Sequence, residues 1–214
     1  MARVYVIQLS EIKKLPPAFA AAHFPRRWYD SARFRFEADR LRSTGAGALL
    51  WYRFGDVEKQ LQSGAYGKPY IKDCAQQFNL SHSGEYVVLA FGEGNIGVDI
   101  EKCTENNLVA AKRVYTPAEL EWMQAEPLSR FETLWTVKES VMKAVGKGFQ
   151  LEPSSFEVLG MLNGEALAID DVKLYCFTKR YRGYTISLCR EKPIQSLIIK
   201  EISEEEILNR EKNA

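Results

Sequence analysis

This chain of 214 residues has few of the features that mark zinc-binding, exported or membrane proteins. Its four cysteines are far apart and only two histidines accompany them, so we expect reduced thiols and no zinc site. No run approaches the roughly 20 apolar residues that a membrane span needs. The first residues read as a strand and not as an export signal, which predicts a cytoplasmic protein.

The chain also lacks an excess of charge of either sign. It has 29 basic and 28 acidic side chains, which gives a formal net charge of +1. We therefore expect neither nucleic acid nor an anionic membrane as a partner. No low-complexity linker or internal repeat interrupts the chain. With 46% hydrophobic residues, it can form one substantial core or two small ones packed together.

Apolar periodicity predicts both strands and helices, which is typical of an α+β fold. Strands are expected at residues 3–9, 172–179, 184–189 and 196–202, the last three in one antiparallel sheet. Helices are expected at about 28–51 and at about 129–145, and the second of these should end at Gly146.

Both halves of the sequence have a helix that leads into strands. We therefore predict two lobes of similar size, residues 1–95 and 96–214, in a pseudo-two-fold arrangement. Each lobe would be an antiparallel sheet packed with helices, and the active site would lie between the lobes. Near this division, two apolar runs flank residues 92–95, whose glycines and asparagine predict a hairpin turn.

Two carboxylates stand out in the second strand of that hairpin, in the sequence GVDIEK at 97–102. Strand side chains alternate, so Asp99 and Glu101 point to the same side. The pair can be the solvated face of a strand. Alternatively it holds Mg²⁺, a hard cation that prefers carboxylate oxygens and completes its coordination with water and substrate phosphates. Glu139, on a facing helix, is the obvious third carboxylate.

The helix expected at 129–145 carries charged residues on and beside its apolar face. Lys138 falls near the middle of that face, where it must either extend its ammonium to water or serve a cleft. Glu139 and Lys143 lie one turn apart on the flank. On their own they can form an exposed ion pair, which contributes about 0.3–0.5 kcal/mol.

Four blocks of sequence, in this order, resemble those of the 4'-phosphopantetheinyl transferases. The blocks are YGKPY at 66–70, NLSHSG at 79–84, GVDIEK at 97–102 and WTVKESVMKA at 135–144. The third matches the family's Gly-x-Asp-x-Glu strand and the fourth its Lys-Glu-x-x-x-Lys helix. Either signature alone is a weak pattern, whereas the four together are specific. The length favours the monomeric, two-lobed type that activates surfactin synthetase.

The resemblance implies a definite reaction. An enzyme of this family transfers the 4'-phosphopantetheine arm of coenzyme A to a serine of an apo acyl, peptidyl or aryl carrier protein. Adenosine 3',5'-bisphosphate leaves, and Mg²⁺ is required. The resemblance further implies that Asp99, Glu101 and Glu139 hold Mg²⁺ against the pyrophosphate, and that Lys143 lies on the phosphate of the leaving group.

The resemblance also implies contacts with the coenzyme. Lys68, Ser81 and His82 would bind its phosphates and adenosine, with His82 near the 3'-phosphate, although His82 on its own could be an ordinary loop histidine. Arg42 occupies the place of a coenzyme-binding arginine. It belongs to a basic cluster that could equally be a solvated helix face: Arg26, Arg27, Arg33, Arg35, Arg40 and Arg42.

Glu119 has two interpretations that do not exclude each other. Its place in YTPAEL matches a family glutamate that would help to deprotonate the attacking serine. The resemblance would then make Glu119 a catalytic residue, together with Glu139 and Lys143. The residues themselves form a capping box, in which Thr116 begins a helix and Glu119 stands three positions later. Glu139 or a metal-bound water could serve as the base instead.

Two other functional classes remain open from the residues. The chain could be a catalytically silent module that binds coenzyme A or a carrier domain. It could also be a different Mg²⁺-dependent phosphotransferase or nucleotide hydrolase that uses the same carboxylates, but no Walker-type loop is present, because GKGF follows its helix instead of preceding it. The sequence does not identify the carrier protein.

Overall fold

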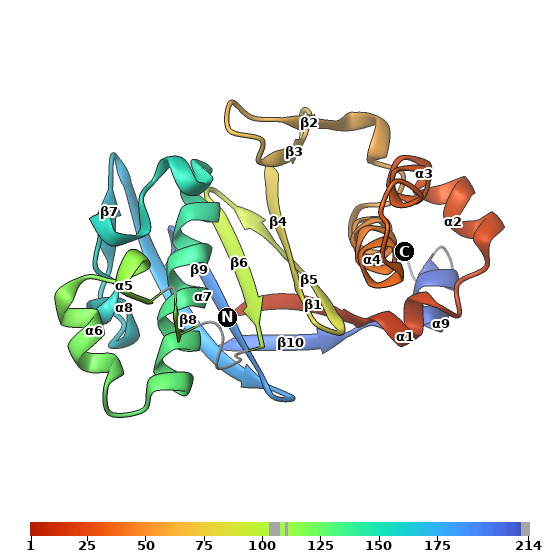
Figure 1. Cartoon of the computed structure of the whole chain (residues 1–214). Helices are drawn as coiled ribbons and strands as arrows, with labels where there is room; N and C mark the ends of the chain where they lie inside the picture. The colour runs from red at the N-terminus through yellow and green to blue at the C-terminus, as the bar shows by residue number, and fades with distance from the viewer. Residues whose placement is uncertain (103–107, 110, 211–214) are drawn as a thin grey trace.

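The computed structural model describes residues 1–102, 108–109 and 111–210 of the chain. The described elements form four layers, with two sheets in the middle and helices on the outer face of each (Figure 1). The α+β class that the sequence predicts, with antiparallel sheets packed against helices, is confirmed. No helix within the described ranges is both long enough and apolar enough to span a bilayer.

The first sheet has the strand order β10-β1-β5-β4. Its strands are β1 (Ala2–Gln8), β4 (Gln76–Ser83), β5 (Tyr86–Glu93) and β10 (Leu197–Glu201). β1 confirms the strand expected at 3–9. The expectation that 196–202 joins an antiparallel sheet with the two preceding strands is wrong, because β10 pairs in parallel with β1. There it covers the outer edge of β1 and buries Leu197 between the two sheets.

The second sheet has the strand order β6-β9-β8-β7, and every pair in it is antiparallel. Its strands are β6 (Ile96–Glu101), β7 (Leu167–Ile169), β8 (Val172–Tyr181) and β9 (Tyr184–Arg190). β8 and β9 confirm the strands expected at 172–179 and 184–189. A separate two-stranded hairpin consists of β2 (Leu61–Ser63) and β3 (Pro69–Ile71).

Helices cover the outer face of each sheet. Beside the first sheet lie α1 (Leu9–Ile12), α2 (Pro17–His23), α3 (Pro25–Ser31), α4 (Glu37–Phe54), the 3-10 helix η1 (Glu58–Gln60) and α9 (Glu204–Leu208). Beside the second lie α5 (Ala111–Val114), α6 (Pro117–Met123), α7 (Pro127–Val145), η3 (Gly148–Gln150), η4 (Pro153–Ser155) and α8 (Leu159–Leu162). α7 confirms the helix expected at about 129–145, and it ends at Gly146 in the left-handed conformation.

The single helix expected at about 28–51 is instead two helices, α3 and α4. The chain turns between them so that α4 packs against α3. Gly47 makes this close approach possible, because a Cβ at that position would lie 2.9 Å from the Phe24 ring and 3.0 Å from Cβ of Arg27. Periodicity continues across such a turn, so the apolar pattern alone does not reveal the break.

The hairpin expected around residues 92–95 is also wrong. β5 lies between β1 and β4, so both of its edges are already paired. β6 therefore crosses to the second sheet, where it pairs with β9. The expected division between residues 95 and 96 falls in this crossing and stays a prediction; β10 and α9 lie with the first sheet although they follow the second in sequence.

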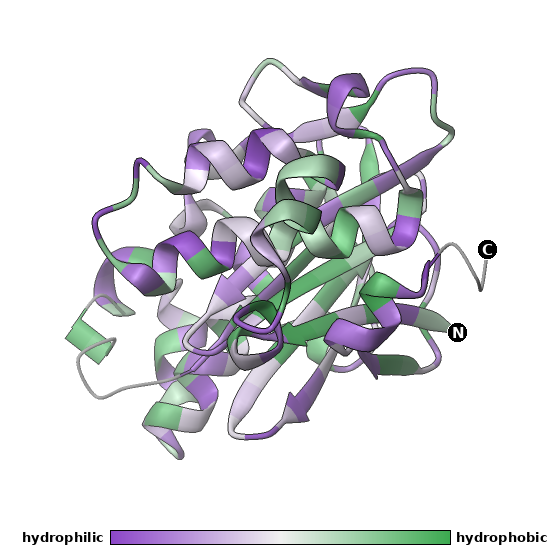
Figure 2. Ribbon diagram, turned by 90° about the vertical axis from the view of Figure 1, so that its right-hand side faces the viewer, coloured by the Kyte–Doolittle hydropathy of each residue, from purple (hydrophilic) through white to green (hydrophobic). Residues whose placement is uncertain are grey.

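Three apolar cores hold the four layers together. The middle core joins the facing sides of the two sheets through residues such as Val4, Val88, Val98 and Ile186. One outer core packs the first sheet against α4, and the other packs the second sheet against α7. Figure 2 shows the most hydrophobic ribbon in the central strands and most hydrophilic segments toward the outside. β6 thus has an apolar side toward the first sheet and a polar side toward α7.

β6 and α7 touch through their backbones at Gly97. A Cβ there would lie 2.0 Å from the Ser140 carbonyl oxygen and 2.5 Å from the Ala144 nitrogen. We expect Gly97→Ala to lower the free energy of unfolding by about 3 kcal/mol in urea denaturation, because the backbones must separate. Gly92→Ala is the matched control, since its Cβ would meet nothing closer than Ile96 Cδ1 at 3.6 Å. Equal midpoints for the two variants would contradict the prediction.

Candidate active site

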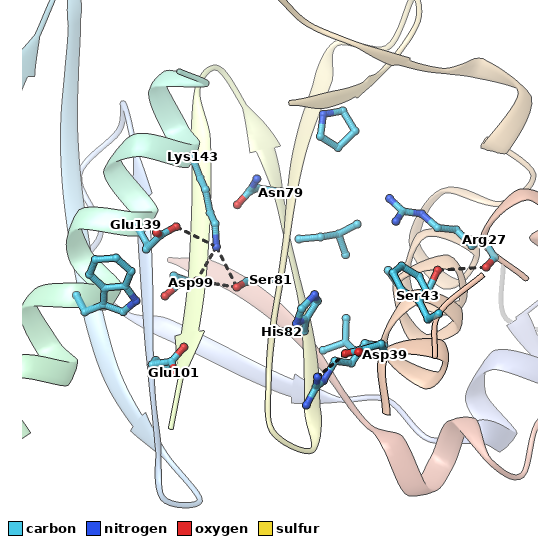
Figure 3. Close-up of a pocket in the computed structure, with 17 residues that line it drawn as sticks. Arg27, Asp39, Ser43, Asn79, Ser81, His82, Asp99, Glu101, Glu139 and Lys143 are labelled. Carbon is cyan, nitrogen blue, oxygen red and sulfur yellow. Dashed lines mark hydrogen bonds and ion pairs between the residues drawn. The ribbon is translucent and has the colours of Figure 1, made fainter. Parts of the chain in front are cut away.

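A cavity of about 640 Å³ crosses the exposed edges of the two sheets, from α4 to α7 (Figure 3). β4 is the edge strand of the first sheet and β6 the edge strand of the second. Most of the side chains expected in the site line this cavity: Arg42, Ser81, His82, Asp99, Glu101, Glu139 and Lys143. The structure therefore brings together residues from α4, β4, β6 and α7.

Side chains of β4 join it to β6 in place of a strand pairing. Alternate residues of β4 point toward β6. The Asn79 Oδ1 atom accepts a hydrogen bond from the Val98 backbone nitrogen at 2.8 Å, and the Ser81 hydroxyl donates to Asp99 Oδ1 at 2.7 Å. Ser83 Oγ accepts from the Lys102 nitrogen at 3.2 Å. The sequence contains this signal as the alternation Asn-x-Ser-x-Ser, but the signal is hidden when β6 is expected to pair with β5.

Lys143 is the centre of the polar contacts at the α7 end of the cavity. Its ammonium lies 2.6 Å from Asp99 Oδ1, 3.0 Å from Ser81 Oγ and 3.7 Å from Glu139 Oε2. Burial alone would lower the pKa of Lys143, but the two carboxylates raise it above its ordinary value. Glu139 and Lys143 are thus not an exposed ion pair, because both side chains face the cavity. The shorter contacts of Lys143 are to Asp99 and Ser81.

The carboxylates outnumber the cations at this end. Burial and the nearby Asp99 raise the pKa of Glu101 to about 7. The pKa of Glu139 is also raised, by burial first and by Asp99 in addition, although Lys143 opposes the shift. The second oxygen of Asp99, Oδ2, is buried and has no hydrogen-bond partner among the residues that the structure describes. These features indicate an uncompensated negative charge that a bound cation would relieve.

The donor set fits Mg²⁺ in its chemistry. Within the described parts of the chain, no three Asp, Glu, His or Cys side chains form a ready-made ligand cluster. Mg²⁺ does not require one, because it binds proteins through one or two carboxylates and takes its other ligands from water and substrate phosphates. The unpartnered Asp99 Oδ2 and the two carboxyls with raised pKa values supply what such a site needs.

The opposite end of the cavity is basic. Arg27 and Arg42 line it together with His82, whose pKa is lowered by burial and by the charges of Arg42 and Lys143. Arg42 is held in place, since it bonds Asp39 Oδ1 at 2.8 Å and the Gly84 carbonyl at 2.9 Å. The rest of the basic cluster does not line this cavity.

Several lining residues were not singled out from the sequence. They include Ser43, Asn79 and Trp135. Trp135 belongs to the motif helix, but its apolar character suggested a place in the core. Ser43 carries no signal of its own in the sequence, and its hydroxyl bonds the Arg27 carbonyl at 3.2 Å across the contact of α3 with α4.

Glu119 lies away from the cavity, in the interior. Its Oε2 accepts a hydrogen bond from the Thr116 nitrogen at 2.8 Å, which completes the capping box, and lies 2.9 Å from the Lys138 ammonium. Its Oε1 accepts from the Val158 nitrogen at 2.9 Å. Both side chains of the ion pair are fully buried. Glu119 is thus placed to hold α6 against α7, and the structure does not support a base at this position.

Lys138 follows neither alternative expected from the helical wheel. It does not extend to water or into the cavity, because its ammonium pairs with Glu119 and donates to the carbonyls of Pro153 at 2.7 Å and Phe156 at 2.5 Å. Burial lowers the pKa of Lys138, an effect that Glu119 opposes. The paired carboxylate explains how a lysine can occupy the apolar face of α7.

Lys68 also lies outside the cavity lining. Its ammonium donates to the Ile96 carbonyl at 2.9 Å and to the Ala144 carbonyl at 3.0 Å. Burial lowers the pKa of Lys68 to about 8. The expectation that this side chain contacts the coenzyme's phosphates is therefore not supported by its position.

Known proteins similar to this chain include several 4'-phosphopantetheinyl transferases. The sequence model of the 4'-phosphopantetheinyl transferase superfamily matches residues 95–189. The chain is 34% identical over 166 residues to the 4'-phosphopantetheinyl transferase Sfp of Bacillus subtilis, which covers 73% of this chain and 74% of that protein. It is 29% identical over 196 residues to the 4'-phosphopantetheinyl transferase psf-1 of Bacillus pumilus, covering 85% of this chain and 84% of that one.

Proposed function

This chain belongs to the 4'-phosphopantetheinyl transferase superfamily, and from that membership we propose that the cavity between β4, β6 and α7 is the site of transfer. The enzyme moves phosphopantetheine from coenzyme A to a serine of a carrier protein. One observation carries the assignment to this cavity: its α7 end is rich in carboxylates and its α4 end in basic side chains. Such a site can hold a cation and an anionic coenzyme side by side.

We propose Asp99, Glu101 and Glu139 as the residues that hold Mg²⁺. The unpartnered Asp99 Oδ2 and the raised pKa values of Glu101 and Glu139 support this assignment. When bound, the ion would supply positive charge. This charge would stabilise the negative charge that develops on the pyrophosphate oxygens during the transfer.

Lys143 is proposed to stabilise the charge on the departing phosphate. Its ammonium already faces the cavity from α7 and is held by Asp99 and Ser81. Arg42, His82 and Arg27 would bind the remaining phosphates at the α4 end, where the bond to the Gly84 carbonyl already holds Arg42 in place.

The transfer needs no reactant besides coenzyme A and the carrier serine. The serine oxygen forms a bond to the phosphorus that carries pantetheine, and the bond from that phosphorus to the bridging oxygen breaks. The electron pair of that bond leaves with adenosine 3',5'-bisphosphate, and the serine proton is released. The polar groups of this chain orient the two phosphates and exclude competing water.

Intact-mass spectrometry tests the proposal directly. A panel of apo acyl, peptidyl and aryl carrier proteins is incubated with the protein, coenzyme A and Mg²⁺, with EDTA added to a parallel set. We expect at least one carrier to gain about 340 Da, the mass of the arm, and the gain to be lost with EDTA. Binding of coenzyme A by calorimetry without any gain would instead identify a catalytically silent binding module.

Mg²⁺ should stabilise the protein more at pH 8 than at pH 6. The pKa of Glu101 is raised from 4.5 to about 7, so the metal-free folded protein binds more protons than the unfolded chain between these values and loses stability as pH rises through them. A cation binds only the ionised carboxyl and offsets that loss. Thermal unfolding at both pH values, with NaCl of equal ionic strength as the control, measures the difference. Equal Mg²⁺-induced shifts would contradict the prediction.

A further inference from the structure

The free edge of β6 is held by side chains from the first half of the molecule. In an antiparallel ladder alternate residues direct their backbone groups away from the partner strand. On β6 these outward groups include the Ile96 carbonyl and the Val98 nitrogen, which bond Lys68 and Asn79. The second sheet therefore meets the first part of the chain through individual side chains at this edge, and each of these bonds affects where β6 lies.

Lys68 differs from the other side chains at this edge because it bonds backbone groups of two elements at once. Besides Ile96 on β6, its ammonium bonds the Ala144 carbonyl in the last turn of α7. The last carbonyls of a helix lack partners within the helix, and the negative end of the helix dipole favours a cation there. The loop that carries Lys68 joins β2 to β3, and this hairpin reaches across the top of the molecule in Figure 1.

The two carbonyls that Lys68 bonds are close in sequence to the groups of the proposed site. Ala144 directly follows Lys143, and Ile96 lies three residues before Asp99. Between these points β6 and α7 are in backbone contact at Gly97. The 2.6 Å distance from Lys143 on α7 to Asp99 on β6 depends on the separation of these two elements, and Lys68 bonds both of them.

We propose that Lys68 is a positioning residue: its ammonium clamps the start of β6 to the end of α7 and so fixes Asp99 against Lys143. The catalytic consequence rests on the function proposed above, whereas the clamp itself does not. A contact with the coenzyme would require the ammonium to leave two backbone carbonyls, one of them at a helix end. The aliphatic part of the side chain is also packed, since its Cδ lies 3.3 Å from where a Cβ of Gly146 would be.

Lys68→Met tests the clamp, because it keeps the packing of the stem and removes every donor. We expect kcat to fall about 10-fold to 100-fold, as for other groups that orient a site. The dissociation constant for coenzyme A should stay within about threefold. Amide hydrogen exchange should become faster in residues 96–101 and 140–146 and stay unchanged elsewhere. Lys68→Arg should restore most of kcat, since its guanidinium also presents several donors.

Lys72→Met is the matched control, because Lys72 is an exposed lysine just beyond β3. It should alter none of these quantities. Should Lys68→Met fail to fold, Lys68→Gln removes the charge and one of the two bonds and is measured in the same way.

Two results would overturn the clamp. Coenzyme A binding weakened more than tenfold, with exchange unchanged, would show that Lys68 contacts the coenzyme. Unchanged exchange and unchanged kcat would show that it positions nothing. If the parent protein transfers no phosphopantetheine at all, the proposed function fails, but the exchange pattern still decides for or against the clamp.

Discussion

Asp99→Asn should lower the rate of carrier loading by roughly 1,000-fold while the protein stays folded. The substitution keeps the size of the side chain and its bond with Ser81, but it removes the charge that faces Lys143. It also neutralises the carboxylate whose Oδ2 is buried without a hydrogen-bond partner among the described residues. Because neighbouring Glu101 and Glu139 repel Asp99, the loss of the ion pair is partly offset, and the melting temperature should change by only a few degrees.

Glu93→Gln is the control for this experiment. Glu93 is exposed at the end of β5 and pairs with the exposed Lys192, so its loss should affect neither loading nor stability. Loading measured by intact mass and melting followed by circular dichroism give the two readouts. Retention of a tenth or more of the parent rate by Asp99→Asn would remove this carboxylate from the proposed metal site.

Breaking the buried ion pair of Glu119 and Lys138 should lower the free energy of unfolding more than any other single substitution considered for this protein. Glu119→Gln leaves the Lys138 ammonium without its carboxylate, and Lys138→Met leaves Glu119 as an unpaired buried charge. Each single variant should lose about 3–5 kcal/mol of unfolding free energy, and the double variant should lose clearly less than the sum. Denaturation in urea, with circular dichroism and fluorescence as parallel probes, measures all three.

The same variants separate the two interpretations of Glu119. At a temperature where Glu119→Gln is still folded, kcat should stay within about threefold of the parent, because the carboxyl is fully buried away from the cavity. A loss of kcat beyond 100-fold in a demonstrably folded protein would restore Glu119 as a candidate base. Glu121→Gln, on the same helix but absent from the capping box, is the matched control.

The sequence predicts well the features that depend on local pattern. β1, α7 with its end at Gly146, and the capping box at Thr116 each lie where alternation or capping chemistry places them. The order of the four motif blocks also predicts that Ser81, Asp99 and Lys143 meet, and the structure brings them within hydrogen-bond distance. These features need only residues close in sequence or a recognisable set of motifs.

The remaining differences come from competition between distant segments. Whether β6 pairs with β5 depends on whether β5 has a free edge, and that depends on β1 and β4. Likewise, motif membership indicates that Lys68 and Glu119 matter but not which way their side chains point. Lys68 turns to backbone carbonyls and Glu119 to a buried lysine. Spacing in sequence carries no information on these directions.

The parallel pairing of β10 with β1 has a consequence for how the molecule forms. Ala2 of β1 lies opposite Leu197 of β10, so the two strands leave the ribosome about 195 residues apart. During synthesis the edge of β1 stays open until nearly all of the second sheet and its helices have emerged. The first sheet therefore cannot close on its own, and its exposed edge is the place where a nascent chain of this protein most needs protection from mispairing.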